Sequence, residues 1–361
     1  MKAKFELYVL CLIALGVIMI FAGCGSEGPE GPKGEDGLRG EEGADYVSLP
    51  PADRIFSLAI FNGSVAHTGN TAILLTADTS VEPNGDVLIM DSVERPPAID
   101  GIDDGSGIWG DHLTDIEISR TPNADNYIRS AKMRAAYDDD YVYFLIQWTE
   151  VENVDPPFEV SADDEHRTWR FDGEDWGRRS GLEDKVALFW LIQGDTANAE
   201  LWQGYGCEVA CHADRPTGMF TTDDTTDIDA WVWGSVTSDP VGFAVDGVVG
   251  YQTDTETNPD GFTRDGGAHT WLDNSAGDGL PAFQHKTGLD YSGSYPVFMW
   301  EIEGFDVDAA WEADATIPGV VMSYPSYSAA DVFSKGQYED GTWTVEMVRA
   351  RNTKNFDDIA F

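Results

Sequence analysis

The chain has 361 residues, with 65 acidic against 22 basic side chains and a formal net charge of −43 at pH 7. A surface this acidic repels nucleic acid, which excludes polynucleotide partners, and it disfavours direct binding to anionic lipid. The acids are spread along the chain, so solubility in salt is favoured over divalent-cation binding or docking to a basic partner as their purpose.

The first residues are typical of a bacterial lipoprotein signal. Lys2 and Lys4 precede an apolar run over about residues 7–21, and a cysteine, Cys24, follows directly after Ala-Gly. An apolar run of this length after a short positive region is typical of a secretory signal and not of a membrane span. We therefore expect a signal peptide over residues 1–23 and a lipid on Cys24; an uncleaved N-terminal anchor is the alternative. The residue after Cys24 is not the Asp of inner-membrane retention, so we expect export and anchoring to the outer membrane.

A collagen-like stretch follows the expected lipidation site. Glycine stands at every third position over residues 28–43, in GPEGPKGEDGLRGEEG. These triplets are too few for a stable triple helix of their own. We interpret residues 24–45 as an extended hydrophilic tether, with a trimerising stalk as the alternative.

From residue 46 onward the pattern changes to short strands. Residues 54–62, 71–77 and 86–90 are rich in β-formers and are broken by Asn-Gly and Gly-Asn turns. We predict an N-terminal β segment over residues 46–98 that packs on a main domain over residues 99–361. The Gly- and Asp-rich loop that opens the main domain lacks the acid spacing of an EF-hand.

A strand–turn–strand unit follows at residues 131–148, AKMRAAYDDDYVYFLIQW. Three aspartates form the turn, and the second strand is apolar on both faces, which predicts a central position in a sheet. Residues 185–192 predict another buried strand. Further on, residues 297–301 and 342–349 look like closing strands, the latter with Thr342, Thr344 and Glu346 outward and its intervening apolar residues inward. Short strands, long loops and no long helix predict an all-β fold, a β-sandwich.

Residues 206–242 carry the most specific chemistry of the chain. Cys207, Cys211 and His212 form a Cys-x-x-x-Cys-His motif, and Met219 follows. Soft sulfur and imidazole ligands beside large flat side chains are what a buried haem requires. Trp231 and Trp233, two residues apart, share one face of a strand, where they serve as core, as a wall against a porphyrin, or as both.

Three interpretations of Cys207, Cys211 and His212 stay open. In the first, both thiols add to haem vinyl groups and His212 binds the iron, although the motif is one residue longer than Cys-x-x-Cys-His. In the second, the cysteines form a disulfide, as an exported chain permits, and His212 binds a non-covalent haem. In the third, the disulfide is purely structural and His212 is idle.

Six motifs occur in one order: IDGIDDGSGIWGD, AAYDDDYVYFLIQWTE, EDKVALFWLI, CEVACHAD with a later Met, DAWVWGSVTSDPVGF and GTWTVEMVRA. This order, from residue 97 to the C-terminus, resembles the haem-binding domain of the ethylbenzene dehydrogenase γ subunit and of the haem subunits of related DMSO-reductase-type enzymes. The resemblance implies an immunoglobulin-like β-sandwich that holds one haem at its end and transfers electrons.

The resemblance also implies axial ligands for the iron. In the γ subunit the haem is b-type and is held by Met and Lys, and Met219 matches the Met position. Related chains often have Lys directly after the second Trp, where this chain has Gly234. Lys286 and Lys335 stand in no matching motif, so no Lys is carried over, and His212 is the second axial candidate.

These observations predict an exported, membrane-anchored electron-transfer protein with one haem per chain, b-type or c-type. Cys207, Cys211, Trp231 and Trp233 are the predicted cofactor contacts, and Met219 and His212 the iron ligands. The expected partner is a redox protein, a molybdenum oxidoreductase or another cytochrome, since no enzyme motif stands in the chain and haem here would leave substrate chemistry to that partner. The alternative is a carbohydrate-binding or surface-display β-sandwich lipoprotein without haem.

Overall fold

The computed structural model describes residues 49–61, 72–118, 130–149, 168–178, 183–193, 221, 224–251, 262–291 and 296–361. All of these fall within one compact unit, Ser48–Phe361. The expected signal peptide and tether lie outside the described residues. Among those residues, no helix is long and apolar enough to cross a membrane.

A sheet of twelve strands forms the main body of this unit, in the order β12-β11-β10-β9-β1-β2-β3-β5-β6-β19-β18, with β4 paired to β5. Neighbouring strands are antiparallel except that β3 is parallel to both β2 and β5. The strands are β1 Arg54–Phe61, β2 Ile73–Thr76, β3 Val87–Ser92, β4 Thr114–Glu117, β5 Ser130–Tyr137, β6 Tyr141–Thr149, β9 Lys185–Gln193, β10 Asp227–Gly234, β11 Val245–Val249, β12 Phe262–Arg264, β18 Phe333–Glu339 and β19 Thr342–Ala350.

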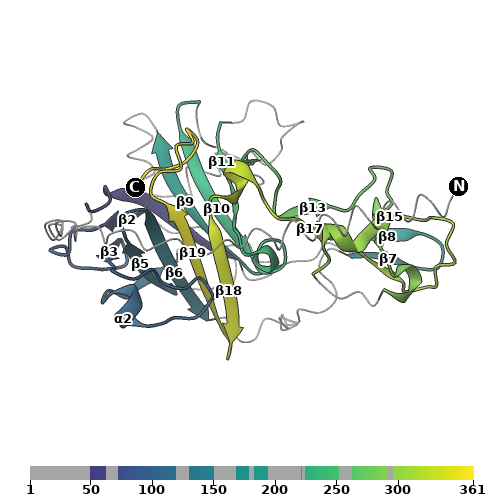
Figure 1. Cartoon of the computed structure of the whole chain (residues 1–361), viewed down its shortest axis with the longest axis horizontal. Helices are drawn as coiled ribbons and strands as arrows, with labels where there is room; N and C mark the ends of the chain where they lie inside the picture. Colours follow the sequence, from purple (N-terminus) through teal and green to yellow (C-terminus); the bar gives the residue numbers. More distant parts are fainter. Residues whose placement is uncertain are drawn as a thin grey trace, which may run out of the picture. The chain divides into compact units, whose positions relative to one another are not determined.

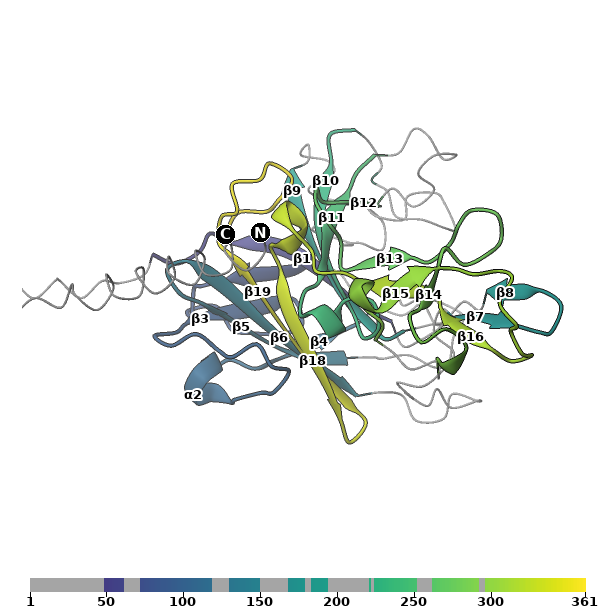
Figure 2. The same cartoon turned by 45° about the vertical axis from the view of Figure 1, so that its right-hand side comes forward.

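The sheet curls so that its two halves face each other. The ring of Phe144 on β6 lies 5.2 Å from that of Trp190 on β9, and Trp343 on β19 lies 5.0 Å from Trp233 on β10. Figures 1 and 2 show β18 and β19, in yellow, running across β9 and β10. The apolar side chains between the halves form the largest core cluster. The all-β sandwich predicted from the sequence is therefore confirmed.

The predicted hairpin is present as β5 and β6, and its turn is fixed by one side chain. Asp138 Oδ1 accepts hydrogen bonds from the backbone N–H groups of Asp140 and Tyr141, at 2.9 and 2.8 Å. The second strand, β6, lies between β5 and β19 as expected. It is apolar on both faces because Tyr143 and Leu145 of its outer face pack with Trp109 of the short helix α2 (Ser106–Trp109).

The outward face of β19 differs from expectation at one residue. Thr342 and Thr344 are half-buried, but Glu346 is fully buried. Its Oε2 accepts the backbone N–H groups of Asp100 and Gly101, at 2.8 and 2.7 Å. The Gly- and Asp-rich loop therefore covers this face and is held there by a carboxylate.

Three small sheets are built from the shorter strands, in the orders β16-β7-β8, β13-β17 and β14-β15. Asn274 connects them: its Nδ2 donates to the carbonyls of Pro318 and Phe283, at 2.6 and 2.9 Å. The strands are β7 Thr168–Phe171, β8 Trp176–Arg178, β13 Trp271–Asp273, β14 Phe283–His285, β15 Ile302–Gly304, β16 Thr316–Pro318 and β17 Val320–Met322.

The strand predicted over residues 297–301 is wrong. Met299–Glu301 is the 3-10 helix η3, because the Glu301 side chain accepts the backbone N–H of Phe298 at 2.8 Å and closes a helical turn. The other 3-10 helices of the described chain are η1 Asp239–Val241, η2 Gly288–Asp290 and η4 Tyr327–Ala330.

Candidate functional site

The predicted iron ligands and cysteines lie outside the described residues. This holds for Cys207, Cys211, His212 and Met219, and equally for Cys24. Their expected roles stay predictions.

The described residues that flank this segment lie at one end of the sandwich. Gln193 is the last residue of β9 and pairs with Asp227, the first residue of β10. Thr221 forms a parallel bridge with Tyr251, just after β11, and its backbone N–H donates to the Gly250 carbonyl at 3.2 Å. The chain therefore leaves β9 and returns toward β10 at the same end of the sandwich, which we call the loop end.

Trp231 and Trp233 share the inward face of β10, as predicted, and both are fully buried in the main core. The ring of Trp231 lies 5.2 Å from Trp190 and 5.8 Å from Phe144. The Trp233 Nε1 donates to Asp239 Oδ1 at 3.0 Å. Both indoles are covered by protein side chains, so they form core, and a role as porphyrin contacts stays a prediction.

Lys286 and Lys335, neither of which stands in a motif that places it on the iron, have other partners. Lys335 Nζ pairs with Asp239 Oδ2, and Lys286 Nζ donates to the Trp300 carbonyl. Lys335 therefore belongs to the polar contacts around Trp233, far along β10 from the loop end.

Charged side chains are buried between the sheet halves near the loop end. Asp229 on β10 and Asp246 on β11 are 0 % and 1 % exposed. Because Asp229 stands two residues before Trp231, and Trp231 pairs with Asp246 across the ladder, both carboxylates point inward with that indole. Arg349 of β19, 0 % exposed, reaches them from the opposite half, with its Nη1 2.6 Å from Asp229 Oδ2.

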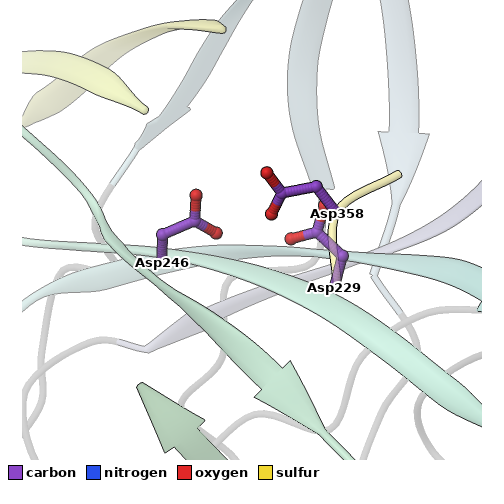
Figure 3. A group of neighbouring side chains, drawn as sticks. All are labelled: Asp229, Asp246 and Asp358. Atoms are coloured by element: carbon purple, nitrogen blue, oxygen red, sulfur yellow. The ribbon is translucent and has the colours of Figure 1, made fainter. Parts of the chain in front are cut away.

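The C-terminal segment closes over this group and adds a third carboxylate. The backbone N–H of Ile359 donates to Asp229 Oδ2 at 2.9 Å, while Arg349 Nη2 donates to the Ile359 carbonyl. Asp358 Oδ1 lies 3.5 Å from Arg349 Nη1. Figure 3 shows Asp229, Asp246 and Asp358 with their carboxylates turned toward a common space. We call these three residues the buried acidic triad.

Burial dominates the electrostatics of this region. It raises the pKa of Asp246 well above its ordinary value, and the negative charge of Asp229 adds to the effect. Burial also raises the pKa of Asp229, although Arg349 opposes the shift. Burial disfavours the Arg349 cation, yet the surrounding carboxylates raise its pKa overall. Beside the triad, burial raises the pKa of Asp265 to about 7.

Sequence reasoning missed the triad, although a signal for it exists. Asp229 and Asp246 are acids inside apolar strands, IDAWVW and AVDGVV, and Asp229 has the same phase as Trp231 and Trp233. An acid at an inward position of a buried strand requires a partner, because an uncompensated buried charge is costly. No such pattern marks Asp358, which reaches the site through a loop.

The family of the chain follows from a comparison with protein-family models. The model described as ethylbenzene dehydrogenase matches residues 108–361, well over half of the chain and most of the stretch on which the six motifs stand. No curated protein matches the chain closely enough to count as a relative. The family predicted from the motif order is confirmed, and the chain belongs to the ethylbenzene dehydrogenase family.

Proposed function

We propose that this protein is an exported, membrane-anchored haem protein that passes electrons to or from a partner oxidoreductase. The observation that carries the proposal is the membership of the chain in the ethylbenzene dehydrogenase family, with the Cys-x-x-x-Cys-His motif and Met219 inside the matched region. The partner would be a molybdenum oxidoreductase or another cytochrome, because the chain holds no motif for substrate chemistry of its own.

The donor set of the segment between β9 and β10 fits a haem iron. An imidazole and a thioether, His212 and Met219, are an axial pair found in cytochromes, and Cys207 and Cys211 are thiols able to attach the vinyl groups. A haem bound there would supply one reversible electron-transfer step between ferrous and ferric iron. The chain's own contribution would be to hold the iron, exclude water and, through an axial thioether, favour the reduced state.

Two features of the described residues support this use of the segment. Its flanks, Gln193 and Thr221, are both anchored to strands by backbone pairing, at the end of β9 and beside the end of β11. Directly behind them stands an aromatic core in which Trp190, Trp231 and Phe361 lie within 6 Å of one another. A well-packed scaffold of this kind keeps ligand geometry fixed, which holds reorganisation during electron transfer low.

The visible spectrum of the full-length chain tests the proposal. Expressed with cytochrome c maturation, the chain should show a Soret band, and the colour should be in the membrane fraction and move to the soluble fraction in Cys24→Ser. Met219→Ala should shift the spectrum and lower the reduction potential, because an axial Met raises it. Met299→Ala, at a partly exposed Met of η3, is the matched control and should change neither.

Absence of a Soret band after haem supplementation would contradict the electron-transfer proposal. Loss of the band on acid-acetone extraction identifies a non-covalent haem, and its retention identifies attachment through Cys207 and Cys211. An unchanged spectrum in Met219→Ala removes Met219 from the iron.

A second candidate function, carbohydrate binding, is favoured by one exposed surface. Phe298, Trp300 and Tyr324 form an aromatic platform: the first two rings stack at 4.4 Å and 12°, and Trp300 and Tyr324 lie 6.1 Å apart at 12°. Trp300 and Tyr324 are 56 % and 55 % exposed. Broad parallel rings open to solvent offer the apolar face on which a sugar ring stacks.

Binding of the full-length chain to insoluble polysaccharides tests this candidate. If it holds, Trp300→Ala should release most of the bound protein, because the largest and most exposed ring of the platform is removed. Phe356→Ala, at a ring that is 94 % exposed and apart from the platform, should leave binding unchanged. Equal binding of the two variants to the polysaccharide, or no binding by the natural chain, would rule out the platform as a carbohydrate site.

A further inference from the structure

The buried acidic triad holds carboxylate oxygens that no protein group satisfies. Asp246 is 1 % exposed, and neither of its carboxylate oxygens has a hydrogen-bond partner. One oxygen of Asp229, Oδ1, and one of Asp358, Oδ1, also lack a hydrogen bond. Unpaired polar atoms at this depth are costly and rare in native proteins, so they indicate a ligand that is not a protein group.

The satisfied oxygens of the triad show that the unsatisfied ones are not a general failure of pairing. Asp229 Oδ2 accepts from Arg349 and from the Ile359 backbone. Asp358 Oδ2 accepts from Thr353 Oγ1 and from Asn355 Nδ2, the latter at 3.2 Å. Asp229 and Asp358 therefore each use one oxygen to join the fold. The other oxygen of each has no hydrogen bond, although Asp358 Oδ1 lies 3.5 Å from Arg349 Nη1, and Asp246 has no hydrogen bond at either oxygen.

The charge of the group calls for a divalent cation. When all three carboxylates are ionised they carry −3, Arg349 carries +1, and the sum is −2, with all four side chains buried. Paired charges are tolerated in an interior, but an uncompensated charge of this size is not.

We propose that Asp229, Asp246 and Asp358 bind one calcium ion. Each contributes a carboxylate oxygen, and these three oxygens lie within 4.8 Å of one another. Calcium–oxygen distances are about 2.3–2.6 Å, so two oxygens bound to one ion stand at most roughly 4.6–5.2 Å apart. The three carboxylate oxygens satisfy this limit.

The ligand set favours calcium over zinc and magnesium. Zinc prefers nitrogen and sulfur donors, and none of the three ligands offers either. Magnesium demands near-ideal octahedral geometry at about 2.0–2.1 Å and retains several waters, which a fully buried site between packed aromatic rings does not favour. Calcium accepts irregular carboxylate geometry and gives up its water more readily.

A second acidic group connects the triad with the surface. Oxygens of Asp265, Asp357 and Asp358 also lie within 4.8 Å of one another, and Asp357 is half-buried. Asp358 belongs to both groups. An ion entering past Asp357 would therefore meet carboxylates continuously until it reaches Asp246.

Calcium titration of the full-length chain tests the site, and the test needs no haem. After EGTA treatment and at neutral pH, calorimetry should give one calcium per chain, with saturation at or below about 1 mM. Calcium at about 100 times its Kd should raise the Tm by roughly 5 °C, because it binds only the folded chain. Magnesium at the same concentration should give a much smaller shift.

Asp246→Asn separates a binding role from a structural one. The variant should lose the calcium-dependent rise in Tm, yet be at least as stable as the calcium-free natural chain, because the amide removes a buried negative charge. Asp115→Asn, at an exposed acid of β4, should keep the full response. Failure to bind calcium up to about 10 mM, an equal magnesium response, or a full calcium response in Asp246→Asn would overturn the proposal.

Discussion

Arg349 joins parts of the chain that are far apart in sequence. Its guanidinium bonds to Asp229 and to the carbonyl of Ile359, and it stacks over the ring of Trp231 at 4.5 Å. One side chain from β19 therefore contacts both β10 and the C-terminal segment. Buried ionic contacts of this kind specify one arrangement more than they add stability, because the desolvation cost offsets much of the attraction.

Glu346 predicts a pH dependence of stability. Burial raises its pKa to about 7 in the folded protein, against an ordinary value of 4.5, although the N–H groups of Gly101 and Asp100 oppose the shift. A raised folded pKa means that the native state binds the proton more tightly. The stabilising contribution is therefore complete below about pH 4.5 and is lost as the pH rises to about 7.

Glu346→Gln should flatten this dependence. In urea unfolding at several pH values from 4.5 to 8, the natural chain should lose stability with pH, by at most about 1.4 kcal/mol per unit for one proton. The variant should show a shallower slope over the same window. Glu339→Gln, an exposed acid of β18, is the control. Parallel slopes in all three proteins would show that Glu346 does not titrate there.

The alternation of β19 shows what the residue pattern contains and what it omits. The inward phase of Trp343, Val345 and Met347 extends to Arg349, so a buried arginine in need of a partner follows from the sequence alone. The identity of the partners does not follow, because Asp229, Asp246 and Asp358 come from other strands and from a loop. Burial of Glu346 depends on a loop more than 240 residues away in sequence, and no local pattern contains that contact.

At the scale of elements, the edge strand β18 is placed by a close approach to β10. An added Cβ at Gly336 would lie 2.3 Å from Cζ2 of Trp233 and 2.9 Å from Cε2. These are atoms of a rigid, fully buried ring. The glycine therefore lets the β18 backbone rest directly on the indole.

Gly336→Ala should consequently displace β18 or the Trp233 indole and destabilise the fold by about 1–3 kcal/mol, the usual cost of overpacking a core. Thermal or urea unfolding measures this. Gly304→Ala, in the strand β15, has no atom within 4 Å of the added Cβ and should behave like the natural chain. Equal stability of the two variants would show that the core relaxes around the extra methyl group.

Long strands with an apolar pattern were the elements that the sequence could specify. The strands predicted at residues 54–62, 131–148, 185–192 and 342–349 are all present, because each buries a continuous apolar face that alternates with the pleat. The strands of three or four residues in the small sheets were not predicted. They are too short to show a period, and their partners, such as β7 and β16, are distant in the chain.

At the scale of the whole molecule, the many acidic residues make the buried acidic triad hard to recognise in the sequence. With 65 acidic side chains, any acidic pair in the sequence carries little meaning. Burial combined with missing hydrogen bonds distinguishes the triad: among the described acids Glu183, Asp184, Asp265 and Glu346 are buried as well, but neither oxygen of Asp246 has a hydrogen-bond partner. The predicted haem ligands present the opposite case: their motif is visible in the sequence and lies outside the described residues.

The order of strands in the large sheet has a consequence for how the family region can be handled. The family match begins at residue 108, but β1, β2 and β3 come before it and stand between β9 and β5 in the sheet. A fragment cut at the family boundary would expose the hydrogen-bonding edge of β9 and the part of the β5 edge, residues 135–137, that β3 covers, while β4 would still pair with the rest of β5. Two unpaired, apolar edges recruit other chains, so such a fragment would be a poor soluble unit. The region that the family model matches is therefore smaller than the compact unit Ser48–Phe361, which includes β1, β2 and β3.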